Sequence, residues 1–549
     1  MSRRVQPLKQ VFFSAAVLLF LAITAVAQLP TTISISDPSG EIADLLRRGR
    51  QLELERRWSE ALMHYEDAVR LHPQETSLRE RFDTVRLHFD LHRRYADMSF
   101  RSSLKELSTE RALNLYGQVL LKIEAHYVEL PCWKALVEHG AASLAVALEE
   151  PDFIEQNVPL AKRLEIESFR DEVRRLLAAR NIAGRADARA VVAEIARLAE
   201  ERLDVAPTAV IMEFLCGATN ALDPYSTYLT PAQLTEVYAQ IEGNFVGLGV
   251  ELKAQNGRLM IVRIIPGSPA AEEGVQAGEQ ILAVDGQSTG ALSTEQAANL
   301  LQGPEGSVVR LTLAAPGRPA HEVRIRRRVV EVPSIEKADL LDPLLGVAYL
   351  RLSCFQKTTA RDLDIVLWKL HHQGMKSLII DLRGNPGGLL IAAVEAADRF
   401  ISRGIIVATR GRNPQEDFTY YAHEQGKWQM PLVVLIDQNS ASAAEIFAGA
   451  IRDHHRGAIV GTRSFGKGSV QGIFPLDVAE AGLRLTTARF YSPNGKPFSQ
   501  VGVEPDVVVR AAAKPLNGSL PDEGADLVLE TARRIAGQQA QSLQARSSF

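Results

Sequence analysis

Two short segments of the sequence contain a serine and a lysine whose settings suit acyl-transfer chemistry. Residues 439–445 include Ser442, and residues 465–471 include Lys467, which follows that serine by 25 residues. A serine hydroxyl is a weak nucleophile at neutral pH and needs a neighbouring base. A lysine can act as that base when burial keeps its amine uncharged. The two segments therefore predict a serine nucleophile with a lysine general base.

The residues around Lys467 favour an uncharged amine. Phe465 is apolar, and Gly466 and Gly468 allow the backbone to pack closely around the lysine. No acidic residue is near in the sequence to stabilise the ammonium form. Gln471 would orient the amine without adding a charge, so we expect it to assist the lysine.

The segment around Ser442 predicts a strand followed by a helix. Residues 432–436 are all apolar, as in a buried parallel strand, and a helical pattern begins at Ala443. Ser442 would then lie at a helix N-terminus, where free backbone N–H groups, including that of Ala443, can face a developing oxyanion.

A second oxyanion donor is expected from a glycine-rich turn. Residues 381–388 directly follow the apolar strand 378–380 and include Gly387 and Gly388. Glycine lets backbone approach a substrate closely. The sequence leaves open which of the two glycines donates.

Each of these features also has an ordinary structural explanation. A serine before a helix is commonly an N-cap, a lysine between glycines is commonly a solvated turn residue, and a Gly-Gly turn after a strand is common. Their occurrence together, at junctions between strands and loops or helices, favours the catalytic interpretation.

These three segments closely resemble those of the carboxyl-terminal processing proteases, also called tail-specific proteases. The resemblance implies that Ser442 is the nucleophile, that Lys467 is the general base and that Gln471 positions the lysine. It also implies an oxyanion hole formed by the backbone N–H of Ala443 and one N–H of the Gly-Gly turn. One departure is Ala444, which occupies a position where many members have another serine, and we expect it to affect packing only.

The resemblance covers residues 105–512. We expect residues 105–238 to form an all-helical region that frames the protease, with Asp223, before Pro224, as a turn or cap residue. The remaining segments that resemble the family are residues 222–229, 485–495 and 502–506.

Residues 245–332 change to short strands and glycine turns that resemble a PDZ domain. In such domains a glycine loop binds the terminal carboxylate of a peptide, and the peptide adds as a strand to the sheet edge. A helix near residues 293–301 would flank that groove. The residues expected to bind the carboxylate are Gly247, Leu248, Gly249 and Val250.

The two ends of the chain lie outside this resemblance. Residues 40–98 have helical spacings that resemble a tetratricopeptide repeat, and one repeat cannot bury its own face, so it must stack on other helices or a second chain. It is either a plain helical hairpin or a docking site for an adaptor protein. Residues 511–549 are expected to form a peripheral tail with one short helix.

The pattern predicts a multidomain α+β protein. Residues 333–510 alternate strands with helices, which indicates an α/β catalytic core that the resemblance identifies as crotonase-like or Clp-protease-like. A chain of 549 residues suggests three or four domains, here a helical N-terminal region, a PDZ domain and the core.

Residues 1–27 resemble a secretory signal peptide. Basic residues precede an apolar run over residues 11–23, and Ala25 and Ala27 fit the small-residue rule for cleavage. We therefore expect export, into a bacterial periplasm, or retention at the inner membrane if the segment is uncleaved.

Composition excludes other functions. The net charge of −4 argues against a nucleic-acid binder, and no His, Cys or carboxylate cluster has ligand spacing, so no metal or cofactor is expected. The cysteines Cys132, Cys216 and Cys354 are expected to be isolated thiols, with a pair between the first two as the alternative.

We interpret the chain as an exported serine endopeptidase whose PDZ domain binds the C-termini of protein or peptide substrates. One alternative catalytic set is a Ser-His-Asp triad that uses His371, His372, His454 or His455. The alternatives from other classes are a catalytically idle scaffold built on the PDZ and tetratricopeptide-like modules, and a small-ligand carrier.

Overall fold

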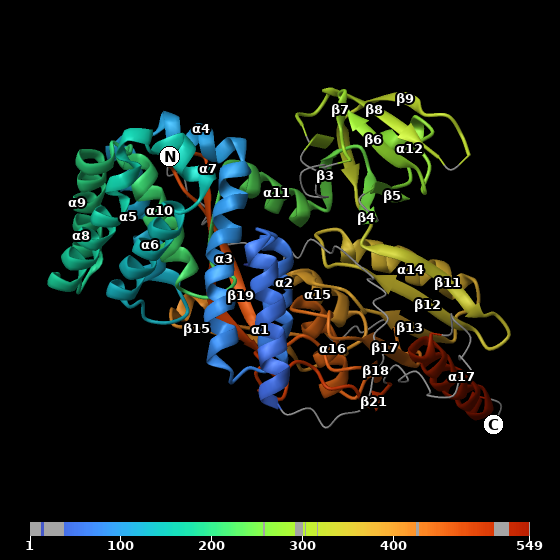
Figure 1. The fold of residues 1–549 in the computed structure, drawn as a ribbon. Coiled ribbons are helices and arrows are strands. Elements are labelled where there is room, and N and C mark those ends of the chain that lie inside the picture. Colours follow the sequence, from blue (N-terminus) through green and yellow to red (C-terminus); the bar gives the residue numbers. More distant parts are fainter. Residues whose placement is uncertain are drawn as a thin grey trace, which may run out of the picture.

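The computed structural model describes residues 12–15, 38–255, 258–290, 300–301, 303–315, 317–423, 428–509 and 526–547. A helical region, a small β domain and a mixed α/β core follow one another along the chain (Figure 1). This arrangement is the predicted α+β architecture.

The helical region surrounds one central helix, α10. Pro207 occupies its first turn, and every residue from Thr208 to Thr219 is buried. A helix that is apolar on all sides belongs in the interior, so the other helices pack around it. The elements are α1 (Pro38–Leu54), α2 (Trp58–Leu71), α3 (Thr76–Ala96), α4 (Met98–Glu106), α5 (Thr109–His126), α6 (Trp133–Ala147), α7 (Pro151–Asn157), η1 (Leu160–Glu165), α8 (Ile166–Ala179), α9 (Arg185–Leu203), α10 (Pro207–Asn220), β2 (Thr227–Leu229) and α11 (Pro231–Glu242).

Helices α1 to α3 form the expected helical hairpin and one more helix. Ala61, Tyr65 and Ala68 are buried, and Gly49 lies so close to the Tyr65 ring that a Cβ there would approach it to 2.1 Å. Glycine is therefore required where these helices cross. The likeness to a tetratricopeptide repeat stays a prediction.

The β domain is a sheet in the order β4-β5-β6-β8-β9, with β7 beside β6. Its core is a small apolar cluster that includes Leu248, Ile261 and Leu311. Most of the helix expected near residues 293–301 lies outside the described residues. The elements are β4 (Val250–Gln255), β5 (Arg258–Ile264), α12 (Pro269–Glu272), β6 (Gln280–Val284), β7 (Gln287–Ser288), β8 (Val308–Ala314) and β9 (His321–Arg326). A two-stranded ribbon of β3 (Asn244–Gly247) and β10 (Arg328–Glu331) joins this domain to the rest.

The core contains a sheet in the order β11-β12-β13-β17-β18-β21. Strands β12 to β21 in this order run parallel, and β13 and β17 are buried throughout, which confirms the prediction of buried parallel strands. The elements are β11 (Ile335–Asp342), β12 (Val347–Leu352), α14 (Thr359–His372), β13 (Ser377–Asp381), α15 (Leu390–Asp398), β17 (Leu432–Ile436), α16 (Ala443–Asp453), β18 (Ala458–Gly461) and β21 (Val507–Val508).

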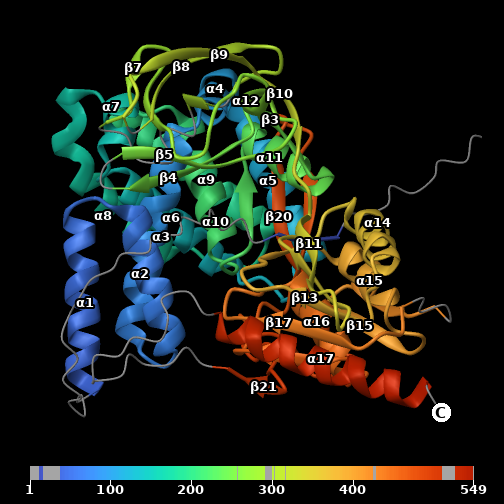
Figure 2. The same cartoon turned by 90° about the vertical axis from the view of Figure 1, so that its right-hand side faces the viewer.

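A second sheet connects the core to the helical region. Its order is β14-β1-β19-β20-β15-β16, and β2 of the helical region pairs with β20. Phe474 and Leu483 from this sheet are buried among the helices, so the two regions share one core. Strand β20 lies beside α5 (Figure 2). The elements are β1 (Phe12–Ala15), β14 (Gly387–Leu389), β15 (Ile405–Gly411), η2 (Pro414–Glu416), β16 (Phe418–Tyr421), β19 (Ser469–Pro475) and β20 (Gly482–Tyr491).

The expectation of a peripheral C-terminal tail is wrong for its helical part. Helix α17 (Leu527–Ser547) covers the face of the parallel sheet opposite to α16, and its Ala532 and Ala536 are buried against Ile379 and Val433. Asp526 also accepts hydrogen bonds from both terminal nitrogens of Arg383, each at 2.8 Å. Small residues on one face let this helix approach the sheet closely, a pattern that the polar composition of the tail obscures.

Strand β1 lies within the segment predicted to be a signal peptide. It runs antiparallel to both β14 and β19 and fills the position between them. Within the described residues, no helix has the length and apolar character needed to cross a membrane. The cysteines Cys132, Cys216 and Cys354 are all free thiols, so the alternative pairing does not form.

Candidate active site

Ser442 occupies a strained turn between β17 and α16. Its backbone angles are φ 59° and ψ −116°, and its side chain is fully buried. This conformation costs a residue with a side chain about 1–3 kcal/mol and persists only where the surrounding contacts enforce it. A sharp strand-to-helix turn of this kind presents the nucleophilic serine of α/β-hydrolases. Gly387 packs against the turn so closely that a Cβ there would lie 2.7 Å from Cβ of Ser442.

Lys467 is buried between β18 and β19. Its side chain is 1% exposed, and among the described residues its Nζ has no hydrogen-bond partner. Burial, together with the like charge of Arg484, lowers the pKa of Lys467 to about 7, against the opposing charges of Glu445 and Asp223. The ring centroid of Tyr225 lies 4.6 Å from Nζ. A large share of the amine is therefore uncharged at neutral pH, as a general base requires.

Glu445 joins the two catalytic candidates. Its Oε2 accepts hydrogen bonds from the backbone N–H of Ser442, at 2.7 Å, and from that of Lys467, at 2.9 Å. Its Oε1 accepts from Ser464 Oγ and from Gly466 N. Burial raises the pKa of Glu445, and these four donors act in the opposite direction. One buried carboxylate thus holds the serine turn against the lysine loop.

The sequence interpretation did not assign Glu445 a role. A signal was present, because a serine followed three residues later by a glutamate is the spacing of a capping box, and the structure forms one here. The box itself explains only the contact with Ser442. The contact with Lys467 arises from the fold.

Gln471 lies in β19, four residues after the lysine, and is fully buried. Its side-chain nitrogen donates to Ser469 Oγ at 2.9 Å and to Thr486 Oγ1 at 3.3 Å. Its Oε1 is buried without a partner among the described residues, as is Nζ of Lys467. No hydrogen bond joins the two side chains in this arrangement.

The Gly-Gly turn follows β13 and forms β14 beside the serine. Gly387 N donates to Asn385 Oδ1 at 2.8 Å, so this N–H is already occupied. Gly387 O accepts from Phe355 N, and Leu389 N donates to Phe355 O. Because successive backbone groups of a strand point to opposite sides, the N–H of Gly388 faces away from Phe355, toward β1.

Ala443 is the first residue of α16, and its N–H lies at the open end of the helix. The Asn385 carbonyl accepts from Ala441 N at 2.9 Å and so ties the Gly-Gly turn to the serine segment. The structure therefore brings Ser442, Ala443 and Gly387 into one site and sets Gly388 beside them.

Two of the four candidate histidines, His454 and His372, have other hydrogen-bond partners. His454 follows the last residue of α16, so the length of that helix separates it from Ser442 by about 18 Å. Its Nε2 bonds to the carbonyl oxygen of Ile405, and His372 Nδ1 bonds to that of Trp368. This geometry disfavours a triad based on either residue.

The predicted carboxylate-binding loop of the β domain lies at the junction of β3 and β4. Leu248 is buried in the domain core, and Gly249 has φ +80°, with Ser268 so near that a Cβ would approach its side chain to 2.1 Å. The carbonyl of Leu248 accepts from Ala270 N, and that of Gly249 from Ile265 N. Gly247 ends β3 and Val250 begins β4.

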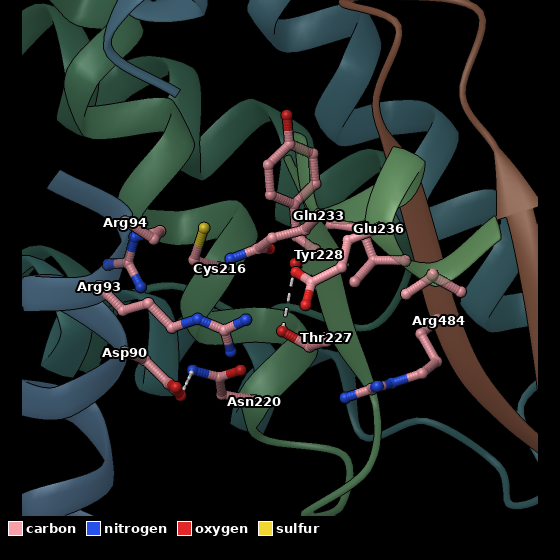
Figure 3. A pocket seen from close by; sticks show the side chains of 12 residues that line it. Asp90, Arg93, Arg94, Cys216, Asn220, Thr227, Tyr228, Gln233, Glu236 and Arg484 are labelled. Atoms are coloured by element: carbon pink, nitrogen blue, oxygen red, sulfur yellow. Dashed lines mark hydrogen bonds between the residues drawn. The ribbon is translucent and has the colours of Figure 1, made fainter. Parts of the chain in front are cut away.

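A separate cavity of about 70 Å³ lies between the helical region and β20. Arg93 of α3 and Arg484 of β20 approach it from opposite sides, and Asn220 donates to Asp90 at its edge (Figure 3). Burial and the like charge of Arg93 lower the pKa of Arg484 to about 10. None of the predicted site residues lines this cavity. Within the described residues, no group of three or more His, Cys, Asp or Glu side chains is arranged to hold a metal.

Comparison with known proteins places these observations in a family. Residues 346–509 match the profile of Peptidase family S41, and residues 260–314 match that of a PDZ domain. A carboxy-terminal-processing protease of Bartonella bacilliformis is 38% identical over 301 residues, which are 53% of this chain and 68% of that protein. A carboxyl-terminal-processing protease of Synechocystis is 36% identical over 292 residues, 52% of this chain and 68% of its own.

Two solved structures are also similar. The photosystem II D1 C-terminal processing protease is 24% identical, covers 78% of this chain and 98% of its own, and has a TM-score of 0.39. The PDZ domain of a Vibrio cholerae carboxy-terminal protease, solved with a peptide, is 25% identical, covers 16% of this chain and 99% of its own, and has a TM-score of 0.16. On the evidence of its relatives, the chain belongs to Peptidase family S41, as a C-terminal processing serine protease with a PDZ domain.

Proposed function

We propose that the chain is an exported serine endopeptidase that hydrolyses peptide bonds with Ser442 and Lys467. The contact that carries this proposal is the carboxylate of Glu445, because one of its oxygens binds the backbone N–H of both residues. The strained turn at Ser442 and the burial of Lys467 support it. A strained serine and a desolvated lysine both destabilise the folded state. Such features cluster at functional sites, so their occurrence together supports a catalytic role.

The reaction proceeds through an acyl-enzyme. Lys467 Nζ removes the proton of Ser442 as Oγ attacks the peptide carbonyl, and it then donates that proton to the leaving amine. A water molecule then loses a proton to the same amine and attacks the ester; as the acyl C–O bond breaks, Lys467 returns the proton to Ser442 Oγ and the new carboxyl terminus leaves. Nζ has no hydrogen-bond partner among the described residues, so no hydrogen bond has to break before the amine accepts the proton.

The oxyanion of the tetrahedral intermediate is stabilised by two backbone N–H groups. Ala443 supplies one from the N-terminus of α16. Gly388 supplies the other, since its N–H faces the position of β1 while the N–H of Gly387 is bonded to Asn385. One such donor typically lowers the barrier by about 3 kcal/mol. Gln471 would supply its unpaired Oε1 to the protonated amine.

The substrate binds as an extended strand between β14 and β19, the position that β1 fills in the full chain. The PDZ domain binds the substrate C-terminus at Gly247, Leu248, Gly249 and Val250 and directs a nearby bond to Ser442. Binding of the tail gates cleavage. An adaptor docked on residues 40–98 stays a prediction, as do the periplasmic location and a membrane anchor at residues 1–27.

The test is the cleavage of casein and of a peptide with a free apolar C-terminus. We expect Ser442→Ala and Lys467→Ala each to reduce kcat about 10³-fold or more. His454→Ala should retain activity, as a control that removes a histidine from the other end of α16. Equal cleavage by wild type and Ser442→Ala would defeat the assignment of Ser442, and no cleavage by wild type would favour the idle scaffold. A Lys467 variant that loses nothing would favour the small-ligand carrier.

Periplasmic extraction followed by N-terminal sequencing tests the location. We expect a mature chain that begins after Ala27. A full-length chain in the membrane fraction would indicate an uncleaved anchor.

A further inference from the structure

The end of the Lys467 side chain faces a turn that belongs to the helical region. The turn Asp223–Ser226 connects α10 to β2, and the ring of Tyr225 in that turn has its centroid 4.6 Å from Nζ of Lys467. That distance lies within the range of cation–π contacts. The same Nζ is buried and has no hydrogen-bond partner among the described residues. The ring therefore packs against the amine.

Hydrogen bonds inside the turn fix its shape. Asp223 Oδ1 accepts from Tyr225 N at 2.7 Å and from Ser226 N at 2.8 Å, and Oδ2 accepts from Ser226 Oγ at 2.8 Å. An aspartate that accepts from the backbone two residues later is a common way to stabilise a tight turn. Asp223 thus has the turn role that its place before Pro224 predicts.

Two further bonds attach the turn to β20. Thr486 N donates to Ser226 Oγ at 3.1 Å, and Arg484 Nε donates to the carbonyl oxygen of Tyr225 at 2.9 Å. Strand β20 is paired with β19, which begins two residues after Lys467. The ring and the lysine are therefore held to neighbouring strands of one sheet.

The ring acts on the amine in two opposite ways. Its face attracts a cation, which favours the ammonium form, and its bulk excludes water, which favours the neutral amine. The other groups that face Nζ are Arg484 from β20, Glu445 from α16 and Asp223 from the turn. Removal of the ring face and removal of the ring bulk should therefore shift the titration of Lys467 in opposite directions.

Building on the proposed role of Lys467 as the general base, we propose that Tyr225 is the positioning residue for that base. Its ring packs against Nζ and keeps the amine from solvent. The helical region thereby contributes to the catalytic machinery of the core.

The experiment compares Tyr225→Phe, Tyr225→Leu and Tyr225→Ala in the full chain, with kcat and KM for a tailed peptide measured across pH. Phe keeps the ring, so kcat should match that of wild type within about twofold. The acid limb of the pH profile, where activity rises as Lys467 loses its proton, should stay at the same pH. Leu keeps an apolar group but removes the π face, so the acid limb should move about half a pH unit lower. Ala admits water, so the limb should move upward. In Tyr225→Leu and in Tyr225→Ala, kcat should fall about tenfold while KM stays within twofold of the wild-type value.

Tyr228→Leu is the matched control, because Tyr228 is buried in the core of the helical region, in β2, and lies outside the turn that contacts Lys467. It should lower the melting temperature and leave the pH profile unchanged. If Tyr225→Leu does not fold, phenylalanine with increasing fluorination at position 225 keeps the shape and weakens the π face. The acid limb should then move stepwise to lower pH.

Three outcomes would overturn the proposal. The acid limb of the pH profile could stay unchanged in every Tyr225 variant, or it could move equally in Tyr225→Leu and Tyr225→Ala. The Tyr228→Leu control could also show the same shift as the Tyr225 variants. Activity that survives Ser442→Ala or Lys467→Met would instead reject the dyad on which the proposal rests. The two failures are thus distinguishable.

Discussion

The buried amine of Lys467 links catalysis to stability at the scale of single residues. Its pKa is lowered from 10.5 to about 7, first by burial. In the folded protein this lysine binds fewer protons than in the unfolded chain between these pH values, so its contribution to stability falls as pH decreases from 10.5 toward 7. At 1.36 kcal/mol per pH unit, the neutral-pH cost is on the order of 4 kcal/mol.

We therefore expect Lys467→Met to be more stable than wild type at pH 7, by a few kcal/mol, and inactive. The gain should shrink as pH approaches 10.5. Urea unfolding at several pH values measures it, with the exposed Lys357→Met as control. A gain that is the same at all pH values would show that the lysine is charged inside the folded protein.

The same titration predicts that kcat/KM of wild type rises with pH through about 7.

Glu445 is the residue that we expect to hold the two catalytic segments together. In Glu445→Gln the amide nitrogen faces N–H donors, so two of the four hydrogen bonds are lost inside the protein. The expected destabilisation is about 2–4 kcal/mol, and kcat should fall more than 10-fold. Thermal unfolding and peptide cleavage measure both effects. Glu530→Gln, on the exposed face of α17, is the control, and an active, stable Glu445→Gln would refute the role.

Strand β1 is informative at the scale of elements, because it occupies the proposed position of the substrate. A chain that begins at residue 28 lacks β1, so the backbone edges of β14 and β19 that pair with β1 are left unpaired. In the full chain, β1 is a tethered competitor of the substrate, with an effective concentration near millimolar. Its removal should therefore lower the apparent KM about tenfold.

Ser14→Pro in the full chain should have the same effect, since proline cannot donate a hydrogen bond to the ladder with Gly388. Steady-state kinetics of the three chains provide the measurement. Identical KM values for the full and truncated chains would mean that β1 does not compete with substrate.

The parallel strands β13, β17 and β18 place the predicted segments at one edge of the core sheet. The Gly-Gly turn follows β13, Ser442 follows β17, and Lys467 follows β18. Parallel neighbours end at the same edge, so side chains far apart in the sequence meet there. The opposite face of the sheet needs α17 as a cover, which explains why the C-terminal helix is part of the core.

At the scale of the whole molecule, the PDZ domain is expected to choose the substrate and the core to cleave it. Gly249→Val should disrupt the carboxylate-binding loop, because a Cβ would lie 2.1 Å from the side chain of Ser268. KM for a tailed peptide should rise about tenfold, while cleavage of a short peptide amide should not change.

Gly267→Ala is the matched control, since Gly267 also has a positive φ but no atom within 4 Å of an added Cβ. It should cost about 1 kcal/mol of stability and leave KM unchanged. If Gly249→Val leaves the tailed substrate unaffected, the loop does not bind the carboxylate. Deletion of residues 245–332 should likewise reduce or deregulate cleavage of tailed substrates.

The sequence by itself determined the local elements around Ser442, Lys467 and the Gly-Gly turn, because apolar strands, glycine turns and helix starts are encoded by neighbouring residues. Only the tertiary structure decided the rest. Glu445 reaches Lys467, Tyr225 covers its amine from another region, Asn385 occupies the N–H of Gly387, and α17 closes the sheet. These contacts join residues that are distant in sequence, and packing, which no local pattern records, brings them together.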